Sequence, residues 1–227
     1  MPYIGKQIHY PRPDGSEAIV ELLTERRAQI LTGALLTVID EGYRSQFSTG
    51  EAGNQMVPAD VIAAKYSPSD KNIERYSDAT RRHFSIGSQI AAVLGKSTLA
   101  IAAFAKVSPA EVAGDAPFQD GCYLNDVIAR QHRTGDGSIA LHAALTRTGQ
   151  DYDKPLVLEG FVGSSVNAWY ERLGLVAVPA IVTGDFSFTS EHTLPMVYYT
   201  TPSSAGLGDV VNALEVAYPN LAYSGTM

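Results

Sequence analysis

A glycine-bearing turn between a strand and a helix is the part of this sequence best suited to bind a ligand. Residues 126–145 begin as an apolar strand, break into the turn His132-Arg-Thr-Gly-Asp-Gly137 and continue as an amphipathic helix from Ser138. Glycines permit positive φ angles and a close approach of a ligand to the backbone. Amides at the start of a helix face outward at its positive end, so this turn can bind a phosphate or diphosphate. A purely structural turn is the alternative.

A second strand and helix follow further along the chain. Residues 155–162 are strand-like, and the short helix after them ends in Tyr170-Glu-Arg-Leu-Gly174, before another strand begins at Leu175. Together with the glycine turn, this order resembles the GNAT superfamily of acyl-CoA-dependent N-acyltransferases. The resemblance covers residues 121–178 and depends upstream on the order of elements alone.

The diphosphate loop of that family has the pattern Arg/Gln-x-x-Gly-x-Gly/Ala, with a valine five residues before the Arg/Gln. Val127 occupies the valine position, but His132 stands where Arg or Gln is usual. Gln131 or Arg133, beside it, could supply the missing donor or charge. The asparagine that the family usually has seven residues before the tyrosine is Gly163 here, and Asn167 is out of register.

The resemblance implies acetyl-CoA as the co-substrate. Its pantetheine would lie between the strand that ends near Ala129 and the strand that begins at Leu156, and its diphosphate on the loop. His132 is expected either to contact a phosphate or to point into solvent. The residues implied in binding the co-substrate belong to the first strand and the loop: Val127, Ala129, Gln131, His132, Arg133, Thr134, Gly135, Asp136, Gly137 and Ser138.

Three residues are candidates for the chemistry of acyl transfer. The resemblance implies that Tyr170 protonates the departing thiolate, and a phenol with an unperturbed pKa near 10 is protonated at neutral pH. The alternative is a core aromatic. The acceptor ammonium must also lose a proton, and the nearest carboxylates are Asp126 and Glu159. Either could accept it directly or through a water, and either could instead be structural. His142 is expected to be a satisfied surface histidine.

The expected fold class is α/β, an α+β mixed sheet with helices on both faces in the order β-α-(α)-β-β-β-α-β-α-β-β. This is the GNAT fold with an extra C-terminal helix over residues 207–218. Thr24 is expected to cap a first helix that Gly42 ends, and Ser69 to cap another. Strands are expected over residues 19–23, 89–94, 99–107, 122–130, 155–162, 175–182 and 195–200.

The chain is expected to form a single GNAT-like domain over residues 1–227. Residues 1–18 would be an extended arm, and residues 203–227 a C-terminal extension. Residues 43–58 either shape the acceptor pocket, as in the family, or form a solvated loop. Residues 108–121 and 183–193 are expected to be loops.

The amino-acid composition argues against several classes of protein. With 17 Lys and Arg against 24 Asp and Glu, the net charge of −7 argues against a general nucleic-acid binder. No apolar run is long enough for a membrane helix, and no signal peptide is recognised at the N-terminus. Cys122 is the single cysteine and is expected to be a small buried hydrophobe, and the histidines have no metal-ligand spacing, so no metal is expected. A cytoplasmic location follows by default.

The leading hypothesis is an acyltransferase that acts on an amine of a small molecule or peptide. A second hypothesis keeps the fold but takes an aminoacyl group from charged tRNA, the one nucleic acid considered as a partner. A third is a non-catalytic acyl-CoA-binding module, favoured by the missing Arg/Gln and asparagine. A homodimer could form through the C-terminal helix and the Tyr198-Tyr199 strand. No pattern in the sequence identifies the acceptor.

Overall fold

A computed structural model describes residues 5–12, 14–48, 56–97, 99–109, 121–131, 134–147, 152–182 and 185–223. Its strands are β1 (Lys6–Pro11), β2 (Glu17–Leu23), β3 (Gln89–Leu94), β4 (Ile101–Pro109), β5 (Cys122–Ala129), β6 (Leu156–Phe161), β7 (Val176–Val182), β8 (Phe186–Ser187), β9 (Thr193–Leu194) and β10 (Met196–Thr200). Its helices are α1 (Glu25–Ile30), α2 (Thr32–Tyr43), α3 (Ala59–Tyr66), α4 (Asp70–Ser85), α5 (Asp136–Arg147), α6 (Asn167–Arg172) and α7 (Leu207–Ala217), with a π-helical turn η1 (Arg44–Ser48) and a 3-10 turn η4 (Pro219–Tyr223).

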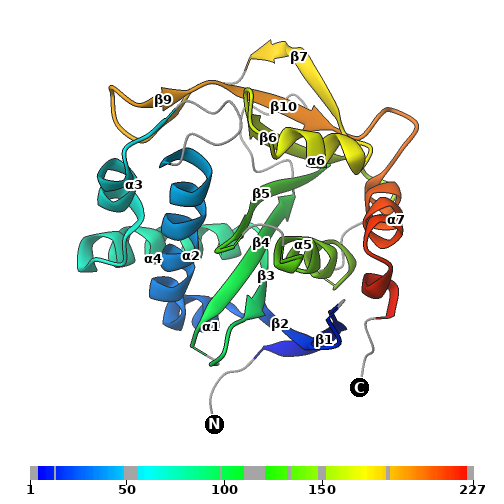
Figure 1. Ribbon diagram of the computed structural model, residues 1–227, viewed down its shortest axis with the longest axis horizontal. Helices are drawn as coiled ribbons and strands as arrows, with labels where there is room; N and C mark the ends of the chain where they lie inside the picture. Colours follow the sequence, from blue (N-terminus) through cyan, green and yellow to red (C-terminus); the bar gives the residue numbers. More distant parts are fainter. Residues whose placement is uncertain are drawn as a thin grey trace.

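Eight strands form one mixed sheet in the order β1-β2-β3-β4-β5-β6-β10-β7. All neighbouring strands are antiparallel except β5 and β6, which are parallel. Helices α2, α3 and α4 lie on one side of the sheet, and α5 and α7 lie on the other (Figure 1). The expected α/β mixed sheet, the extra C-terminal helix and the predicted strands are therefore confirmed.

Strand alternation divides the buried residues between the two faces of the sheet. Ile90 and Ala92 of β3 pack in the cluster that includes α1 and α2, whereas Ala91 and Val93 pack in the cluster that includes α5 and α7. Successive side chains of a strand point to opposite faces, so a sheet with apolar cores on both sides needs apolar residues at nearly every position. β3 and β4 have this composition.

The first helical segment starts as expected but ends later. The hydroxyl of Thr24 accepts a hydrogen bond from the backbone of Arg27, as an N-cap does. The chain then forms α1 and α2, and α2 continues through Gly42 into η1, so the prediction that Gly42 ends the helix is wrong. Gly42 serves close packing instead, because a Cβ there would lie 2.6 Å from Cγ2 of Ile128 on β5.

The N-terminal residues are part of the sheet. The segment expected to be an extended arm forms β1, which pairs along its whole length with β2 and adds an outer strand. The turn between the two strands is held by a 2.8 Å hydrogen bond from the Arg12 amide to the Ser16 carbonyl, and by the Asp14 carboxylate, which accepts from Ser16. The hairpin therefore has a fixed tip at one edge of the sheet.

Residues 183–193, expected to be a loop, contain the small β8–β9 hairpin where the structure describes them. It packs on α2 and α3 through a cluster of aromatic rings: Tyr43, Phe47, Tyr66, Phe161, Phe186 and Phe188. Residues 49–55, part of the 43–58 segment, and residues 110–120, most of the predicted 108–121 loop, lie outside the described residues. No helix in the described part of the chain has the length and apolar character that crossing a membrane requires.

Candidate functional site

The parallel strands β5 and β6 pair at their beginnings and then diverge. They share three register pairs, Cys122 with Leu156, Tyr123 with Val157 and Leu124 with Leu158. Beyond these pairs β5 follows β4 to Ala129, and β6 follows β10 to Phe161. The facing N–H and C=O groups of the two diverging segments are therefore not bonded to each other, and they can bind an extended ligand that carries amides.

A β-bulge accounts for this divergence. Lys106 of β4 pairs with Asp126 of β5, but the next residue, Val107, pairs with Leu124, so Asn125 is the extra residue. Its side-chain oxygen accepts a 2.7 Å hydrogen bond from the hydroxyl of Ser108. A bulge bends and twists its strand. This bend comes directly after the last pair with β6, and it turns β5 away from that strand.

The glycine turn follows β5 and leads into α5. Gly135 has a φ of +82°, which favours glycine, and a Cβ at this position would meet no atom of the described residues within 4 Å. Thr134 bridges the turn, because its hydroxyl donates to the Gln131 carbonyl and accepts from the Asp136 amide. Among the described residues, the space beside Gly135 is thus open to a ligand at the start of a twelve-residue helix. His132 and Arg133 lie outside the described residues.

Three other predicted binding residues lie with their side chains turned to the core. Val127 and Ala129 pack against the apolar cluster on the α5 side of the sheet, and Ser138 is buried in the first turn of α5. A Cβ at Gly137 would lie 3.8 Å from that of Ala129. What these residues offer a ligand is therefore backbone, which agrees with a motif made of glycines and not of charged side chains.

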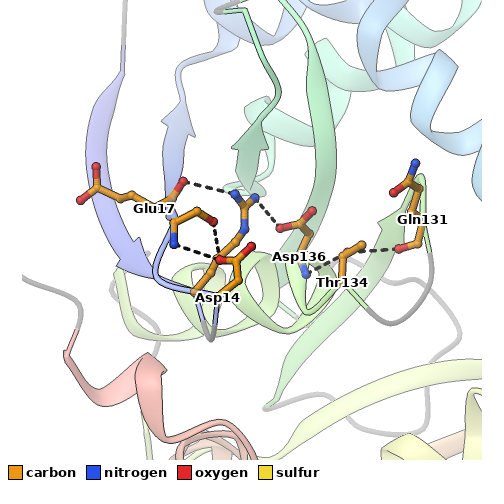
Figure 2. A network of polar contacts seen from close by, with 7 residues as sticks. Asp14, Glu17, Gln131, Thr134 and Asp136 are labelled. Atoms are coloured by element: carbon orange, nitrogen blue, oxygen red, sulfur yellow. Dashed lines mark hydrogen bonds and ion pairs between the residues drawn. The ribbon is translucent and has the colours of Figure 1, made fainter.

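Asp136, the first residue of α5, has a partner from the distant N-terminal hairpin. Its carboxylate lies 2.7 Å from the guanidinium of Arg12, and the residue is only 8% exposed. Arg12 also donates a 3.2 Å hydrogen bond to the Glu17 carbonyl. Figure 2 shows Glu17 of the hairpin on one side of Asp136, and Thr134 of the loop on the other. No local sequence pattern indicates that these two segments meet.

Asp126, a candidate for the base, forms an ion pair across the strands. Its carboxylate lies 2.6 Å from the ammonium of Lys106, and both side chains are largely buried. Burial raises the pKa of the Tyr66, Tyr76 and Tyr170 hydroxyls, and the negative charge of Asp126 raises each of them further. The carboxylate is therefore within electrostatic reach of tyrosines from α3, α4 and α6.

Glu159, the other candidate, lies on the face of β6 that carries Tyr198 of β10 beside it. Burial raises the pKa of Tyr123, and the charge of Glu159 and a hydrogen bond to it raise that pKa further. Both predicted bases therefore have a partner. Sequence reasoning missed His83 of α4, whose pKa is lowered by burial and by Lys106, which favours the neutral ring.

Tyr170 lies near the end of α6, where Gly174 takes a φ of +84° and the helix stops. The residue is 8% exposed, and its ring centroid is 5.7 Å from that of Tyr199. Its hydroxyl forms no hydrogen bond with another described residue. Burial, the strongest influence, raises the pKa of Tyr170 and keeps the phenol protonated at neutral pH. Tyr170 therefore carries a proton at neutral pH, and its raised pKa makes it a weaker acid than a free tyrosine.

Asn167, which is out of register with the asparagine of the family pattern, lies beside β6. It begins α6, and its side-chain nitrogen donates a 2.9 Å hydrogen bond to the carbonyl of Phe161. Its side-chain oxygen is buried and has no hydrogen-bond partner among the described residues. A Cβ on Gly160 would lie 2.9 Å from that oxygen. An unsatisfied acceptor therefore lies against the end of β6.

His142 and Cys122 are structural. His142 is buried rather than on the surface, which corrects the expectation, because its ring bridges the hydroxyl of Tyr10 at 3.1 Å and the carboxylate of Glu215 at 3.0 Å. Cys122 is buried as expected, and burial raises the pKa of its thiol to about 12, which suppresses the nucleophilic thiolate. The described residues contain no group of three side chains arranged to hold a metal.

Neither a scan of protein-family models nor a search of curated proteins gives a match to this sequence. Solved structures do match. A ribosomal-protein-alanine N-acetyltransferase from Brucella melitensis has a TM-score of 0.51 at 11% identity, covering 80% of this chain and 98% of that one. FdhC, a nucleotide-linked sugar GNAT, has a TM-score of 0.52 at 9% identity, covering 96% and 98%. The chain has the GNAT fold.

An N-acetyltransferase from Staphylococcus aureus Mu50 is similar at a TM-score of 0.50 and 12% identity, covering 85% of this chain and 99% of that one. The GNAT fold predicted from the glycine turn and the Tyr170 helix is therefore confirmed. Because these structures are covered almost entirely, this chain contains the whole GNAT fold. Identities this low concern the fold, and the acceptor of each relative remains a property of that relative.

Proposed function

We propose that this protein is an N-acyltransferase that transfers an acyl group from acyl-CoA to an amine. One observation carries the proposal: β5 and β6 diverge immediately before the glycine turn, after only three register pairs. The unbonded edges of the two strands suit the amides of pantetheine. The turn, with open space at Gly135, suits the diphosphate at the start of α5. Acetyl is the acyl group that the family resemblance implies.

The residues present fit this co-substrate. Gln131 and residues 134–138 would hold the diphosphate through the backbone, and Val127 and Ala129 would hold the pantetheine in the same way. Asn167 supports the fit independently, because its buried oxygen lacks a hydrogen donor beside β6. A pantetheine amide between the strands would supply one.

The chemistry is a direct transfer. The neutral amine attacks the thioester carbon, a C–N bond forms, and the C–S bond then breaks. Tyr170 donates its phenolic proton to the leaving thiolate, a role that its place at the end of α6 and its unbonded hydroxyl support. The proton lost by the amine goes to Asp126 or Glu159, directly or through a water, and a proton from solvent restores Tyr170. The products are the amide and free CoA.

The acceptor is an amine of a small molecule or a peptide. The tyrosines near Asp126 that come from α3 and α4, Tyr66 and Tyr76, place aromatic and hydroxyl groups on the side of the sheet opposite α5, whereas Tyr170 packs in the cluster on the α5 side. An acceptor that enters from the side of α3 and α4 meets the thioester at the divergence of the strands, while the nucleotide remains at the turn.

Two measurements test the proposal. Calorimetric titration with acetyl-CoA should give saturable binding with one site per chain, and free pantetheine should bind more weakly. Release of the CoA thiol in the presence of a broad panel of amines should then exceed release without amine. Absence of any binding would refute the proposal. Tight binding without amine-dependent thiol release would favour a non-catalytic binding module.

A further inference from the structure

A positively charged side chain from outside the glycine motif reaches the candidate diphosphate loop. β1, β3 and β5 end at the edge of the sheet at which β2 and β4 begin, so the tip of the β1–β2 hairpin and the turn after β5 share one edge. Helix α5 starts at this edge and packs across β2, β3 and β4. Arg12 at the hairpin tip thereby meets Asp136, although 124 positions separate them.

The negative charge of Asp136 opposes the binding of an anionic ligand at the start of α5. Its carboxylate stands at the first position of α5 and is almost inaccessible to water, next to the amides proposed to bind a diphosphate. The Asp136 carboxylate and a diphosphate bound beside it are both negatively charged and repel each other. The repulsion is stronger where water is excluded. A counter-charge is needed before an anion can bind beside this residue, and Arg12 provides it.

Arg12 also has unused hydrogen-bonding capacity. A guanidinium carries five N–H donors, and the described contacts of Arg12 are one bond to Asp136 and one to the carbonyl of Glu17. About a quarter of the side chain is exposed. The remaining donors suit a phosphate, because guanidinium forms strong charge-assisted bonds with phosphate oxygens.

We propose that Arg12 is a phosphate-binding residue of the CoA site and brings a cation to the loop in which His132 stands at the usual Arg/Gln position. The proposal rests on the proposed function. The phosphate is either the diphosphate or the 3′-phosphate of CoA, which share the same recognition chemistry. The N-terminal hairpin is then part of the cofactor site.

Binding measurements with three ligands test this proposal: CoA, 3′-dephospho-CoA and pantetheine. Replacement Arg12→Met should weaken CoA binding about tenfold or more and leave pantetheine binding unchanged. If the contact is with the diphosphate, 3′-dephospho-CoA shows the same loss, whereas if it is with the 3′-phosphate that ligand shows none. Arg12→Lys should retain part of the affinity. Arg81→Ala, an equal change of charge on the exposed side of α4, is the control.

A second replacement separates phosphate binding from a structural brace. If Arg12 only braced the loop, Asp136→Asn would break the same pair and weaken CoA binding as much as Arg12→Met does. If Arg12 binds phosphate, Asp136→Asn removes the competing carboxylate, and CoA binds at least as tightly as to the unaltered protein. Equal losses in the two variants, a matching loss for pantetheine, or an unchanged CoA affinity in Arg12→Met would each overturn the proposal. Failure of the unaltered protein to bind both CoA and pantetheine would instead refute the proposed function.

Discussion

The ammonium of Lys106 lies 2.6 Å from the carboxylate of Asp126, directly across the strand pair that contains the bulge. Replacement Lys106→Met leaves a largely buried carboxylate without its partner, and the expected cost is about 3 kcal/mol in the free energy of unfolding. Urea denaturation at pH 7 measures it. The double replacement Lys106→Met with Asp126→Leu should lose less than Lys106→Met alone, because no unpaired charge remains. A larger loss in the double variant would contradict this account.

Removal of the Tyr170 hydroxyl should affect turnover more than structure. Since this hydroxyl has no hydrogen bond within the described chain, Tyr170→Phe should unfold at nearly the same denaturant concentration as the unaltered protein. Loss of the proton donor should lower kcat about a hundredfold, with little change in the KM for acyl-CoA. Steady-state thiol release measures both constants. Tyr199→Phe, which alters a neighbouring ring of the same kind, is the matched control. Unchanged turnover in Tyr170→Phe would show that the acid lies elsewhere.

The turn at Gly135 should be sensitive to any side chain. Gly135→Ala forces a residue with a Cβ into a φ of +82°, at an expected cost of about 1 kcal/mol in stability. It also places a methyl group where the diphosphate would bind, so the Kd for CoA should rise at least tenfold. Gly87→Ala imposes the same strain at a φ of +85°, away from the loop, and should lower stability without changing this Kd. Equal CoA affinity in both variants would remove the loop from the site.

Asn167 should contribute to binding of the pantetheine arm. Asn167→Ala removes the buried oxygen that lacks a partner and the hydrogen bond to the Phe161 carbonyl. We expect affinity for CoA and for free pantetheine to fall by the same factor of about five to ten, since one hydrogen bond is lost with either ligand. A loss confined to CoA would place the contact on the nucleotide instead.

Stability should fall in mild acid because of His142. Burial lowers the pKa of His142 below 6.5, and the hydrogen bond to Glu215 only partly opposes this effect. The unfolded chain then binds more protons than the folded one, so the stabilisation is present above pH 6.5 and is lost as the pH falls through the folded pKa. The slope is at most about 1.4 kcal/mol per pH unit for one proton.

Denaturation in urea between pH 7.5 and pH 5 measures this slope. In His142→Gln the slope should decrease but persist, because burial also lowers the pKa of His83. A slope that is the same in His142→Gln and in the unaltered protein would assign the whole effect to other groups.

The fold was predictable where local patterns specify it. Apolar periodicity and the caps at Thr24 and Ser69 located most helices, and the turn at Gly135 with the helix end at Gly174 identified the GNAT arrangement. Gly42 was misread, because a glycine that ends a helix and a glycine that lets a helix approach a strand look the same in sequence. Its role depends on Ile128, a residue of another element.

The site was less predictable, because its partners are joined across the sheet. Nothing local to Asp126 indicates Lys106 until the register of β4 and β5, including the extra residue at the bulge, is known. Arg12 was assigned to an arm outside the sheet, since its turn carries no signal for the distant helix that it meets. Local sequence thus indicates the backbone of the candidate site, and tertiary pairing determines which charges lie beside it.

The hydrogen bonds from Tyr10 to His142 and from His142 to Glu215 connect the two ends of the chain to the helix that follows the glycine turn. β1 and α7 lie near the two ends of the chain, and each supplies one of the two groups that satisfy this imidazole. Trimming either terminus would leave a buried ring nitrogen without its partner beneath the helix. Forms shortened at either end should therefore lose solubility and affinity for CoA together.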